Sequence, residues 1–209
     1  MIDLIEPKIN KYLKGLINQD DAVLQEMEKL AEKWDFPIVG FQVGQILYLM
    51  AKLKNPKVIF ELGSGFGYSA WWFARAIGAK AKVHWTDRSQ ENFKLAKDFL
   101  KKANLEQKIV FHFGDAIQSL KSFNGKVDLL FVDMDKESYP AAYRLFKERC
   151  RKGAVLIADN MLWDGRVIRK SKEASTQGIQ EFTRLVFDDP DMVSTILPIR
   201  DGVLISILN

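Results

Sequence analysis

The sequence lacks the features that mark secreted, membrane-embedded or strongly charged proteins. One cysteine among 209 residues allows no disulfide within the chain, which favours a cytoplasmic protein. The longest apolar runs have only strand length, and the first residues lack the basic start and apolar core of a secretory signal, so we expect neither a transmembrane span nor a leader. The net charge of +4 tolerates an anionic substrate or RNA but demands neither, and nothing indicates DNA or a membrane as a partner.

No low-complexity tract or linker rich in serine and glycine divides the chain, so we expect one domain over residues 1–209. Apolar residues recur at helical spacing between residues 3 and 35, and Asp35-Phe36-Pro37 ends that pattern. We expect residues 1–56 to form a helical segment that contributes to the substrate site and, in a dimer, to the contact between subunits.

From residue 57 onward, strand-like and helical patterns alternate. The strand-like runs are residues 58–62, 82–86, 109–113, 127–133 and 154–159. Two more runs, 193–199 and 203–208, flank the turn Arg200-Asp201-Gly202 and predict a hairpin. Repeated strand–helix units predict an α/β fold with a mainly parallel sheet, helices on both faces, and an antiparallel strand contributed by the C-terminal hairpin.

The single cysteine, Cys150, falls on the apolar stripe of a predicted helix. Its neighbours Arg149 and Arg151 could lower the pKa of the thiol, as adjacent cations do in reactive cysteines. A plain thiol on a helix face is the simpler interpretation.

The glycine-rich stretch ELGSGFGYS (61–69) follows the first predicted strand and leads into a helix near Tyr68. Glycine lets the backbone approach a ligand closely. No lysine follows Gly67, so this is not a phosphate-binding GxxxxGK[ST] loop. The dinucleotide pattern GxGxxG fails when counted from Gly63, and from Gly65 it fits only the looser form that ends on Ala70. The loop therefore leaves open the possibility of a cofactor that contains a nucleoside, but it disfavours a dinucleotide.

Acidic residues at the ends of the next two predicted strands support an adenosine pocket. Ligands of open α/β sheets bind beyond the carboxyl ends of the strands. Asp87 could accept the ribose hydroxyls or cap the following helix. Asp115 could accept the exocyclic amine of adenine or cap a turn. With the glycine loop, these two residues describe an adenosine site without an evident pyrophosphate site.

Carboxylate and amide side chains end the fourth and fifth predicted strands. If those strands are neighbours, Asp133, Asp159 and Asn160 converge above the sheet, and their oxygens suit Mg²⁺ or another hard divalent cation. Taken alone, each residue could instead form a turn or a helix cap. Zinc is disfavoured because the two histidines, both expected in mid-strand, share no cluster with the cysteine.

Taken together, these motifs resemble a known family. ELGSGFGYS, Asp87 and GDA (114–116) are similar to the cofactor site of class I S-adenosylmethionine-dependent methyltransferases. Asp133-x-x-Lys136 and Asp159-Asn160 resemble the metal motifs of the cation-dependent O-methyltransferases, the group that contains catechol and caffeoyl-CoA O-methyltransferases. The resemblance implies a Rossmann-like class I methyltransferase fold with seven strands, extra N-terminal helices and a homodimer.

The resemblance also implies roles for the matched residues. Asp133, Asp159 and Asn160 match the metal ligands, and Lys136 matches the general base. A divalent cation nearby would disfavour the ammonium form of Lys136, although a lysine that faces solvent or pairs with a carboxylate such as Asp135 stays open.

The cofactor contacts implied by the resemblance begin with Tyr68 and Ser69 at the methionine portion, Asp87 at the ribose, and Asp115 with Ala116 at the adenine. The full set of implied cofactor residues is Val39, Glu61, Gly63, Gly65, Tyr68, Ser69, Asp87, Arg88, Asp115, Ala116 and Asp133.

The expected reaction is methyl transfer from S-adenosylmethionine to an oxygen of a small catechol-like or phenolic acceptor, free or linked to CoA. Trp163 could stack on an acceptor ring or belong to the core, and Arg200 stands where relatives often have glycine. Basic residues in 160–172 would suit a CoA phosphate or RNA, so methylation of a tRNA wobble uridine is the alternative. A non-catalytic adenosine-binding module is a second alternative, against which the complete metal motifs argue.

Overall fold

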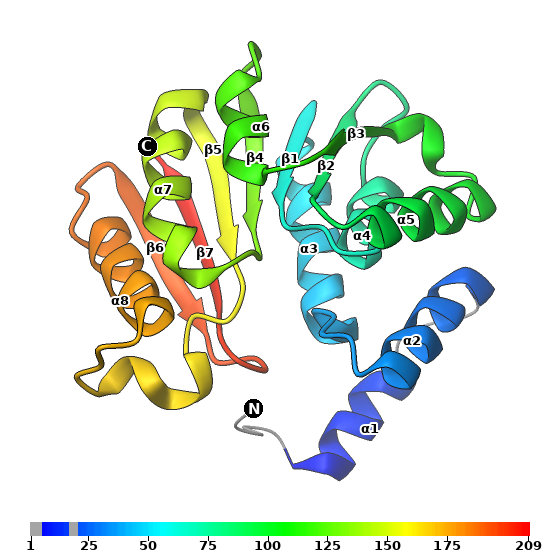
Figure 1. Ribbon diagram of the computed structural model, residues 1–209, viewed down its shortest axis with the longest axis horizontal. Helices are drawn as coiled ribbons and strands as arrows, with labels where there is room; N and C mark the ends of the chain where they lie inside the picture. The colour runs from blue at the N-terminus through cyan, green and yellow to red at the C-terminus, as the bar shows by residue number, and fades with distance from the viewer. Residues whose placement is uncertain (1–5, 17–20) are drawn as a thin grey trace.

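The computed structural model of the protein describes residues 6–16 and 21–209 (Figure 1). The predicted N-terminal helix is divided into α1 (Pro7–Gly15) and α2 (Ala22–Trp34), and positions 3–5 and 17–20 of that prediction lie outside the described residues. Asp21 is the N-cap of α2, because its carboxylate accepts hydrogen bonds from the backbone N–H groups of Val23 and Leu24 at 3.0 and 3.1 Å. The helix α3 (Gly40–Lys54) then leads to the sheet.

Within the described residues, seven strands form one sheet in the order β3-β2-β1-β4-β5-β7-β6. Their bounds are β1 (Val58–Leu62), β2 (Lys82–Asp87), β3 (Ile109–Phe113), β4 (Val127–Val132), β5 (Cys150–Ala158), β6 (Met192–Leu197) and β7 (Val203–Leu208). Strands β1 to β5 pair in parallel, and β7 pairs antiparallel with both β5 and β6. The predicted mainly parallel sheet with an antiparallel C-terminal strand is confirmed.

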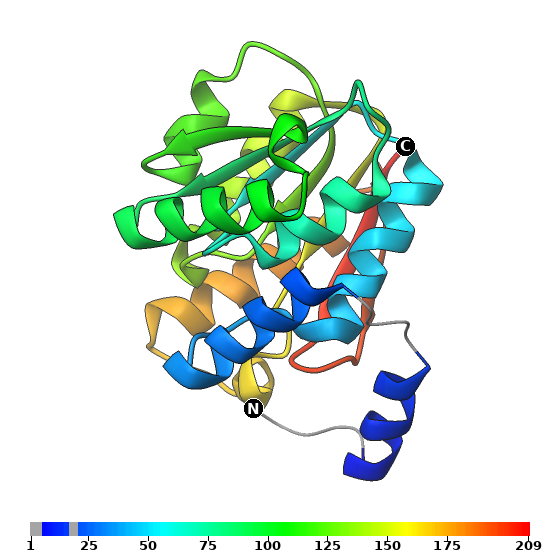
Figure 2. The same ribbon diagram turned by 90° about the vertical axis from the view of Figure 1, so that its right-hand side faces the viewer.

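Helices cover both faces of the sheet (Figures 1 and 2). The remaining α-helices are α4 (Tyr68–Ala76), α5 (Gln90–Lys102), α6 (Ala116–Ser122), α7 (Tyr139–Arg149) and α8 (Ala174–Phe187). Short 3₁₀ turns are η1 (Glu106–Lys108), η2 (Lys136–Ser138) and η3 (Trp163–Ile168). Side chains alternate across each strand, so Ile59 packs with α2 to α5 on one face and Phe60 with α6 to α8 on the other. The core is therefore two apolar layers separated by the sheet.

Cys150 is the first residue of β5, and the prediction that it lies on a helix face is wrong. Helix α7 ends at Arg149 because the backbone of Cys150 is extended, with φ −96° and ψ 165°. The thiol is buried, and burial raises its pKa to about 12. Lowering of its pKa by the flanking arginines is therefore also wrong.

The described helices include none that could cross a membrane, because each is too short or too polar across the residues 6–16 and 21–209.

Candidate active site

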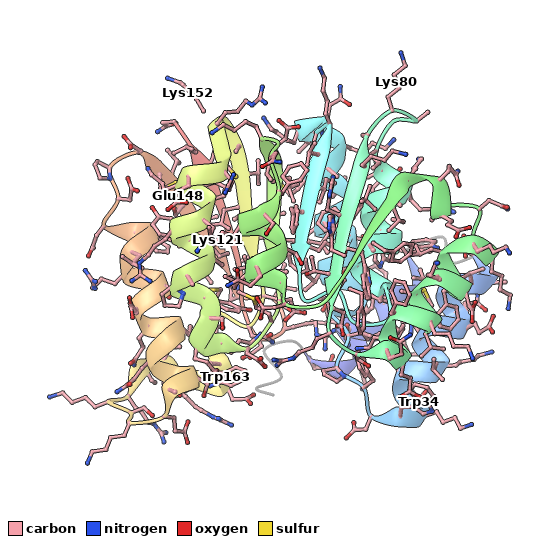
Figure 3. All side chains as sticks on the ribbon, turned by 45° about the horizontal axis from the view of Figure 1, so that its top comes forward. Trp34, Lys80, Lys121, Glu148, Lys152 and Trp163 are labelled. Carbon is pink, nitrogen blue, oxygen red and sulfur yellow. The ribbon has the colours of Figure 1, made fainter. Side chains whose placement is uncertain are left out.

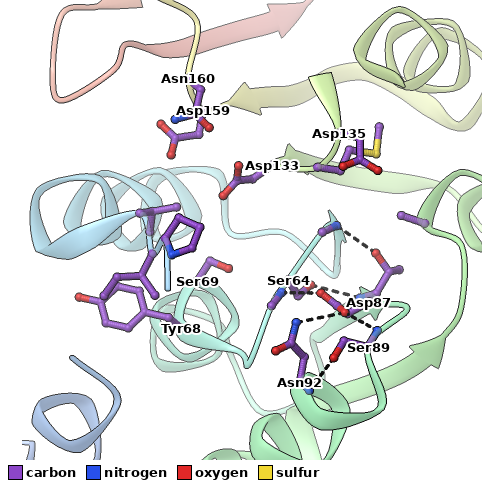
Figure 4. Close-up of a pocket in the computed structure, with 18 of the residues that line it drawn as sticks. Ser64, Tyr68, Ser69, Asp87, Ser89, Asn92, Asp133, Asp135, Asp159 and Asn160 are labelled. Atoms are coloured by element: carbon purple, nitrogen blue, oxygen red, sulfur yellow. Dashed lines mark hydrogen bonds between the residues drawn. The ribbon is translucent and has the colours of Figure 1, made fainter. Parts of the chain in front are cut away.

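A cavity of about 640 Å³ opens at the carboxyl ends of the parallel strands (Figure 4). All but one of the predicted site residues line it: Val39, Gly63, Gly65, Tyr68, Ser69, Asp87, Arg88, Asp115, Ala116, Asp133, Lys136, Asp159 and Asn160. Figure 3 shows Trp163 at this end of the molecule, opposite Lys80 and Lys152 near the starts of β2 and β5. The topology thus gathers these predicted residues, which span 121 positions from Val39 to Asn160, around one cavity.

The glycine loop lines the cavity, and all three of its glycines, Gly63, Gly65 and Gly67, have positive φ, so a side chain at any of them would be strained. Gly63 has φ 86°, and a Cβ there would lie 2.1 Å from the backbone oxygen of Asp133, so the loop touches the end of β4 directly. Gly67 has φ 93° and begins α4. Backbone N–H groups of the loop are held by β2, since Gly63 donates to the hydroxyl of Thr86 at 3.2 Å.

Asp87, at the end of β2, braces the glycine loop rather than capping the next helix. Its Oδ2 accepts from the N–H of Gly65 at 3.1 Å, and its Oδ1 accepts from Ser89 N at 2.7 Å and Asn92 Nδ2 at 3.2 Å (Figure 4). Ser89 is the N-cap of α5, with its hydroxyl accepting from Asn92 N. The capping role considered for Asp87 is wrong, and its contact with a ribose stays a prediction.

Asp115 caps α6, because its carboxylate accepts from the N–H of Gln118 at 2.8 Å while the residue also lines the cavity. Arg88 forms an ion pair with Asp135 across the cavity mouth, and both side chains are mostly exposed. The pairing of Asp135 with Lys136, considered from the sequence, is therefore wrong.

Glu61 is the predicted site residue that does not line the cavity. It is fully buried in β1, beneath the glycine loop. Neither carboxyl oxygen of Glu61 has a hydrogen-bond partner among the described residues, although the hydroxyls of Ser69 and Ser64 face it. Burial raises the pKa of Glu61 to about 8, with a smaller contribution from the charge of Asp133. At neutral pH this carboxyl therefore keeps its proton in the ligand-free protein.

The predicted trio of oxygen donors lies on two adjacent strand ends. Strands β4 and β5 are neighbours with Val132 opposite Ala158, so Asp133 and Asp159 emerge side by side (Figure 4). Asn160 follows in the left-handed region with φ 59°, which asparagine tolerates better than most residues. The convergence expected from neighbouring strands is thus present.

The cluster has the chemistry of a cation site. Asp159 is 6% exposed, and its Oδ1 has no hydrogen-bond partner among the described residues. Burial, and then the charge of Asp133, raise the pKa of Asp159 well above its ordinary value. The described part of the chain holds no group of three His, Cys, Asp or Glu side chains arranged for a metal, so Asn160 would be the third donor. Two carboxylates and an amide oxygen fit Mg²⁺, and a cation there would satisfy the unpaired oxygen.

Lys136 is buried beside this cluster, so the solvent-facing alternative is wrong. Its Nζ donates to Asp133 Oδ1 at 3.1 Å and to the Tyr139 hydroxyl at 2.9 Å. The Tyr139 hydroxyl in turn lies 3.0 Å from the backbone oxygen of Asp159. Burial raises the pKa of Tyr139 well above its ordinary value, so the phenol stays protonated and holds the amine in place.

Sequence reasoning missed Tyr139 and Asp201. Tyr139 shares helical spacing with Tyr143 and Phe146, which is typical of an apolar core stripe, and only its position three residues after Lys136 indicates a second role. Asp201 is buried at the cavity edge, in the turn between β6 and β7. Arg200 also lines the cavity, and its Nη1 donates to the backbone oxygen of Ile38 at 2.9 Å.

Trp163 lines the cavity and lies over the Lys136 amine, with 5.8 Å from Nζ to the ring centre. The Nε1 atom of Trp163 is buried without a hydrogen-bond partner among the described residues. The two histidines lie outside the cavity, where His84 Nδ1 and His112 Nε2 are 2.8 Å apart. Burial lowers the pKa of both rings, so they behave as core residues of neighbouring strands.

Comparison with known proteins identifies the family. A family model described as O-methyltransferase matches residues 16–208. The chain belongs to the O-methyltransferase family. Caffeoyl-CoA O-methyltransferase 2 of Populus trichocarpa is 30% identical to this O-methyltransferase over 200 residues, which cover 88% of this chain and 81% of the relative. Catechol O-methyltransferase of Niastella koreensis is 28% identical over 221 residues and the full length of both chains.

A solved structure shows the same fold. The O-methyltransferase from Bacillus cereus, solved in complex with SAH, superposes with a TM-score of 0.90 at 25% identity, covering 97% of each chain. The predicted Rossmann-like methyltransferase fold and the predicted family are both confirmed for this O-methyltransferase.

Proposed function

We propose that the protein transfers a methyl group from S-adenosylmethionine to an oxygen of a small catechol-like or phenolic acceptor, free or linked to CoA, with a divalent cation at Asp133, Asp159 and Asn160. The observation that carries this proposal is the buried carboxylate of Asp159, which lies beside Asp133 and Lys136 and whose Oδ1 has no hydrogen-bond partner among the described residues. Relatives named for caffeoyl-CoA and catechol, and a relative that binds SAH, support the choice of reactants.

The cofactor end of the cavity is the glycine loop and the ends of β2 and β3. In this proposal Tyr68 and Ser69 contact the methionine portion, Asp87 the ribose, and Asp115 with Ala116 the adenine. The hydrogen bond that the Gly65 N–H donates to Asp87 holds the loop backbone in place before the cofactor arrives. A pre-formed site loses less conformational entropy on binding, which favours affinity.

The acceptor end is the carboxylate cluster with Lys136. A divalent cation bound there would hold two vicinal acceptor oxygens and favour loss of the proton from the attacking one. Lys136 Nζ is the proposed acceptor of that proton, and its hydrogen bonds to Asp133 and Tyr139 fix the position of the nitrogen. The acceptor oxygen forms a bond to the methyl carbon as the carbon–sulfur bond breaks, and the electron pair stays on sulfur to give S-adenosylhomocysteine.

The test is methylation of a simple catechol with Mg²⁺, then with chelator, in wild type and Asp159→Ala. We expect chelator and the substitution each to abolish turnover while S-adenosylmethionine binding survives, because the cofactor end does not use Asp159. Exposed Asp98→Ala is the matched control and should keep full activity. Undiminished turnover in chelator would refute the cation, and full activity of Asp159→Ala would refute the ligand assignment.

One observation favours a second candidate substrate, a tRNA wobble uridine. Arg166, Arg169, Lys170 and Lys172 are exposed in the segment that follows Trp163, a cavity-lining residue, and the Arg166 guanidinium lies 5.3 Å from the centre of the Trp163 ring. Phosphate contacts by such residues release counterions, so tRNA binding should weaken steeply with salt. Catechols, phenolic acyl-CoA thioesters and tRNA should therefore be assayed side by side, and methylation of tRNA alone would replace the small-molecule proposal.

We also propose that the protein works as a homodimer in the cytoplasm, where a lone thiol stays reduced. In support, the outer side of α3 exposes Leu49 and Leu53, and the neighbouring face of β6 and β7 exposes the paired Val193 and Ile207. Figure 2 shows α3 (cyan) beside β7 (red). Adjoining apolar surface of this kind commonly marks a protein contact.

A further inference from the structure

Asp201 links the β6–β7 turn to the segment that follows β5. Its side chain is 5% exposed, and its backbone oxygen accepts from Leu162 N at 2.8 Å. Its Oδ1 accepts from the N–H of Asp164 at 2.8 Å, and its Oδ2 lies 3.4 Å from Asn160 Nδ2. The backbone oxygen and both carboxylate oxygens of Asp201 therefore contact residues 160–164.

The contact with Asn160 determines which end of its amide faces the cavity. An ionised carboxylate only accepts hydrogen bonds, whereas an amide has an NH₂ donor at one end and an oxygen acceptor at the other. Asp201 Oδ2 therefore selects the orientation in which Asn160 Nδ2 points to the turn. The amide oxygen of Asn160 is then directed away from the Asp201 carboxylate.

We infer that Asp201 is a positioning residue that holds the Asn160 amide with its oxygen, and not its nitrogen, toward the cation. The inference rests on the proposed cation site, because a hard divalent ion accepts an amide oxygen as ligand and not an NH₂ group. Residues that hydrogen-bond to metal ligands commonly contribute 10- to 100-fold to metal affinity.

The two oxygens of Asp201 separate this role from a purely structural one. Oδ1 braces the segment of residues 163–165, where Trp163 and Asp164 both have positive φ, at 46° and 52°. Oδ2 contacts the amide of Asn160. Asp201→Asn can keep an oxygen at the first position while it presents NH₂ at the second. That NH₂ would favour a reversed Asn160 amide, with nitrogen toward the cation.

The experiment is a double-substitution cycle read by Mn²⁺ binding, measured by electron paramagnetic resonance on wild type, Asp201→Asn, Asn160→Asp and the double variant. We expect Asp201→Asn to weaken Mn²⁺ binding about 10- to 100-fold when residue 160 is asparagine. We expect Asp201→Asn to weaken Mn²⁺ binding less than about 3-fold when residue 160 is aspartate, because both ends of a carboxylate are oxygen acceptors. Thermal unfolding and S-adenosylhomocysteine affinity of the metal-free variants serve as folding controls.

Each outcome decides between explanations. An equal loss in both backgrounds would mean that Asp201 acts through its negative charge alone, and it would overturn the positioning role. Unchanged Mn²⁺ affinity in Asp201→Asn would overturn it as well, while leaving the cation site intact. Failure of the wild type to bind Mn²⁺ would instead overturn the proposed cation site, and the inference with it.

If Asp201→Asn does not fold, wild-type crystals grown with Mn²⁺ decide the question. Anomalous density should place the ion next to one end of the Asn160 amide. An amide whose other end lies within hydrogen-bond distance of Asp201 supports the inference. An ion bound without Asn160, or an Asn160 amide turned away from Asp201, would overturn it.

Discussion

Replacement of Glu61 by glutamine should change how stability depends on pH. The carboxyl of Glu61 is fully buried, and burial raises its pKa from 4.5 to about 8. A carboxyl with a raised pKa binds more protons in the folded than in the unfolded chain, so it lowers stability as pH rises from the unfolded to the folded pKa. At about 1.4 kcal/mol for each unit, the full effect above pH 8 is on the order of 5 kcal/mol.

Denaturant unfolding of metal-free, cofactor-free wild type and Glu61→Gln, measured from pH 4.5 to 9, tests this reasoning. The free energy of unfolding of wild type should fall relative to Glu61→Gln across that range, with most of the change complete by pH 8. Burying the glutamine amide has its own cost, but that cost does not depend on pH, so the change of the difference with pH is diagnostic. Exposed Glu32→Gln removes the same charge and is the control.

A difference between the two proteins that stays constant from pH 4.5 to 9 would refute the reasoning. It would show that Glu61 is ionised and paired in the folded protein. A wild type that gains stability over Glu61→Gln as pH rises would refute it more strongly, because the sign of the linkage would be reversed.

Three further predictions concern catalysis, the cofactor and assembly. Lys136→Met should lower kcat about 10²- to 10⁴-fold with S-adenosylmethionine affinity unchanged in calorimetry, because it removes the proton acceptor alone; unchanged kcat would exclude Lys136 as the base. Asp87→Ala should weaken S-adenosylhomocysteine binding at least about tenfold, since it removes the acceptor for Gly65 N–H as well as the proposed ribose contact, and undiminished affinity would contradict that placement. Leu53→Glu should convert a dimer to a monomer in light scattering, whereas exposed Lys80→Glu should not; a dimer that survives Leu53→Glu places the interface elsewhere.

The sheet was predictable because its strands are strongly apolar and are punctuated by polar residues at their carboxyl ends. Asp87, Asp133 and Asp159 all follow such runs, and parallel pairing brings strand ends to one edge regardless of their separation in sequence. The glycine loop was predictable because its structure requires glycine. Gly63 lies so close to the end of β4 that no side chain fits there, and this requirement is visible in the sequence as a glycine-rich stretch.

The remaining features depend on contacts that periodicity does not encode. Asp201 reaches the site only because the β6–β7 hairpin folds back onto residues 160–164. The ring of Tyr139 packs in the core, and its hydroxyl accepts a hydrogen bond from Lys136 Nζ. The apolar spacing in the sequence indicates only the core packing. Cys150 continues the apolar spacing of α7, yet its backbone turns extended at that residue and begins β5.

Strand β7 lies inside the sheet, so the turn that carries Asp201 reaches the cavity only when β7 has paired with β5. In the described structure β6 pairs with β7, and β7 in turn pairs with β5, so the two strands dock as one unit. A molecule in which that unit has come loose keeps its glycine loop and the carboxylates of Asp133 and Asp159, yet has no Asp201 beside Asn160. Under the proposed function, such a molecule would still bind S-adenosylmethionine at the glycine loop, whereas its acceptor end would lack the residue that orients Asn160, so methyl transfer would require the completed sheet.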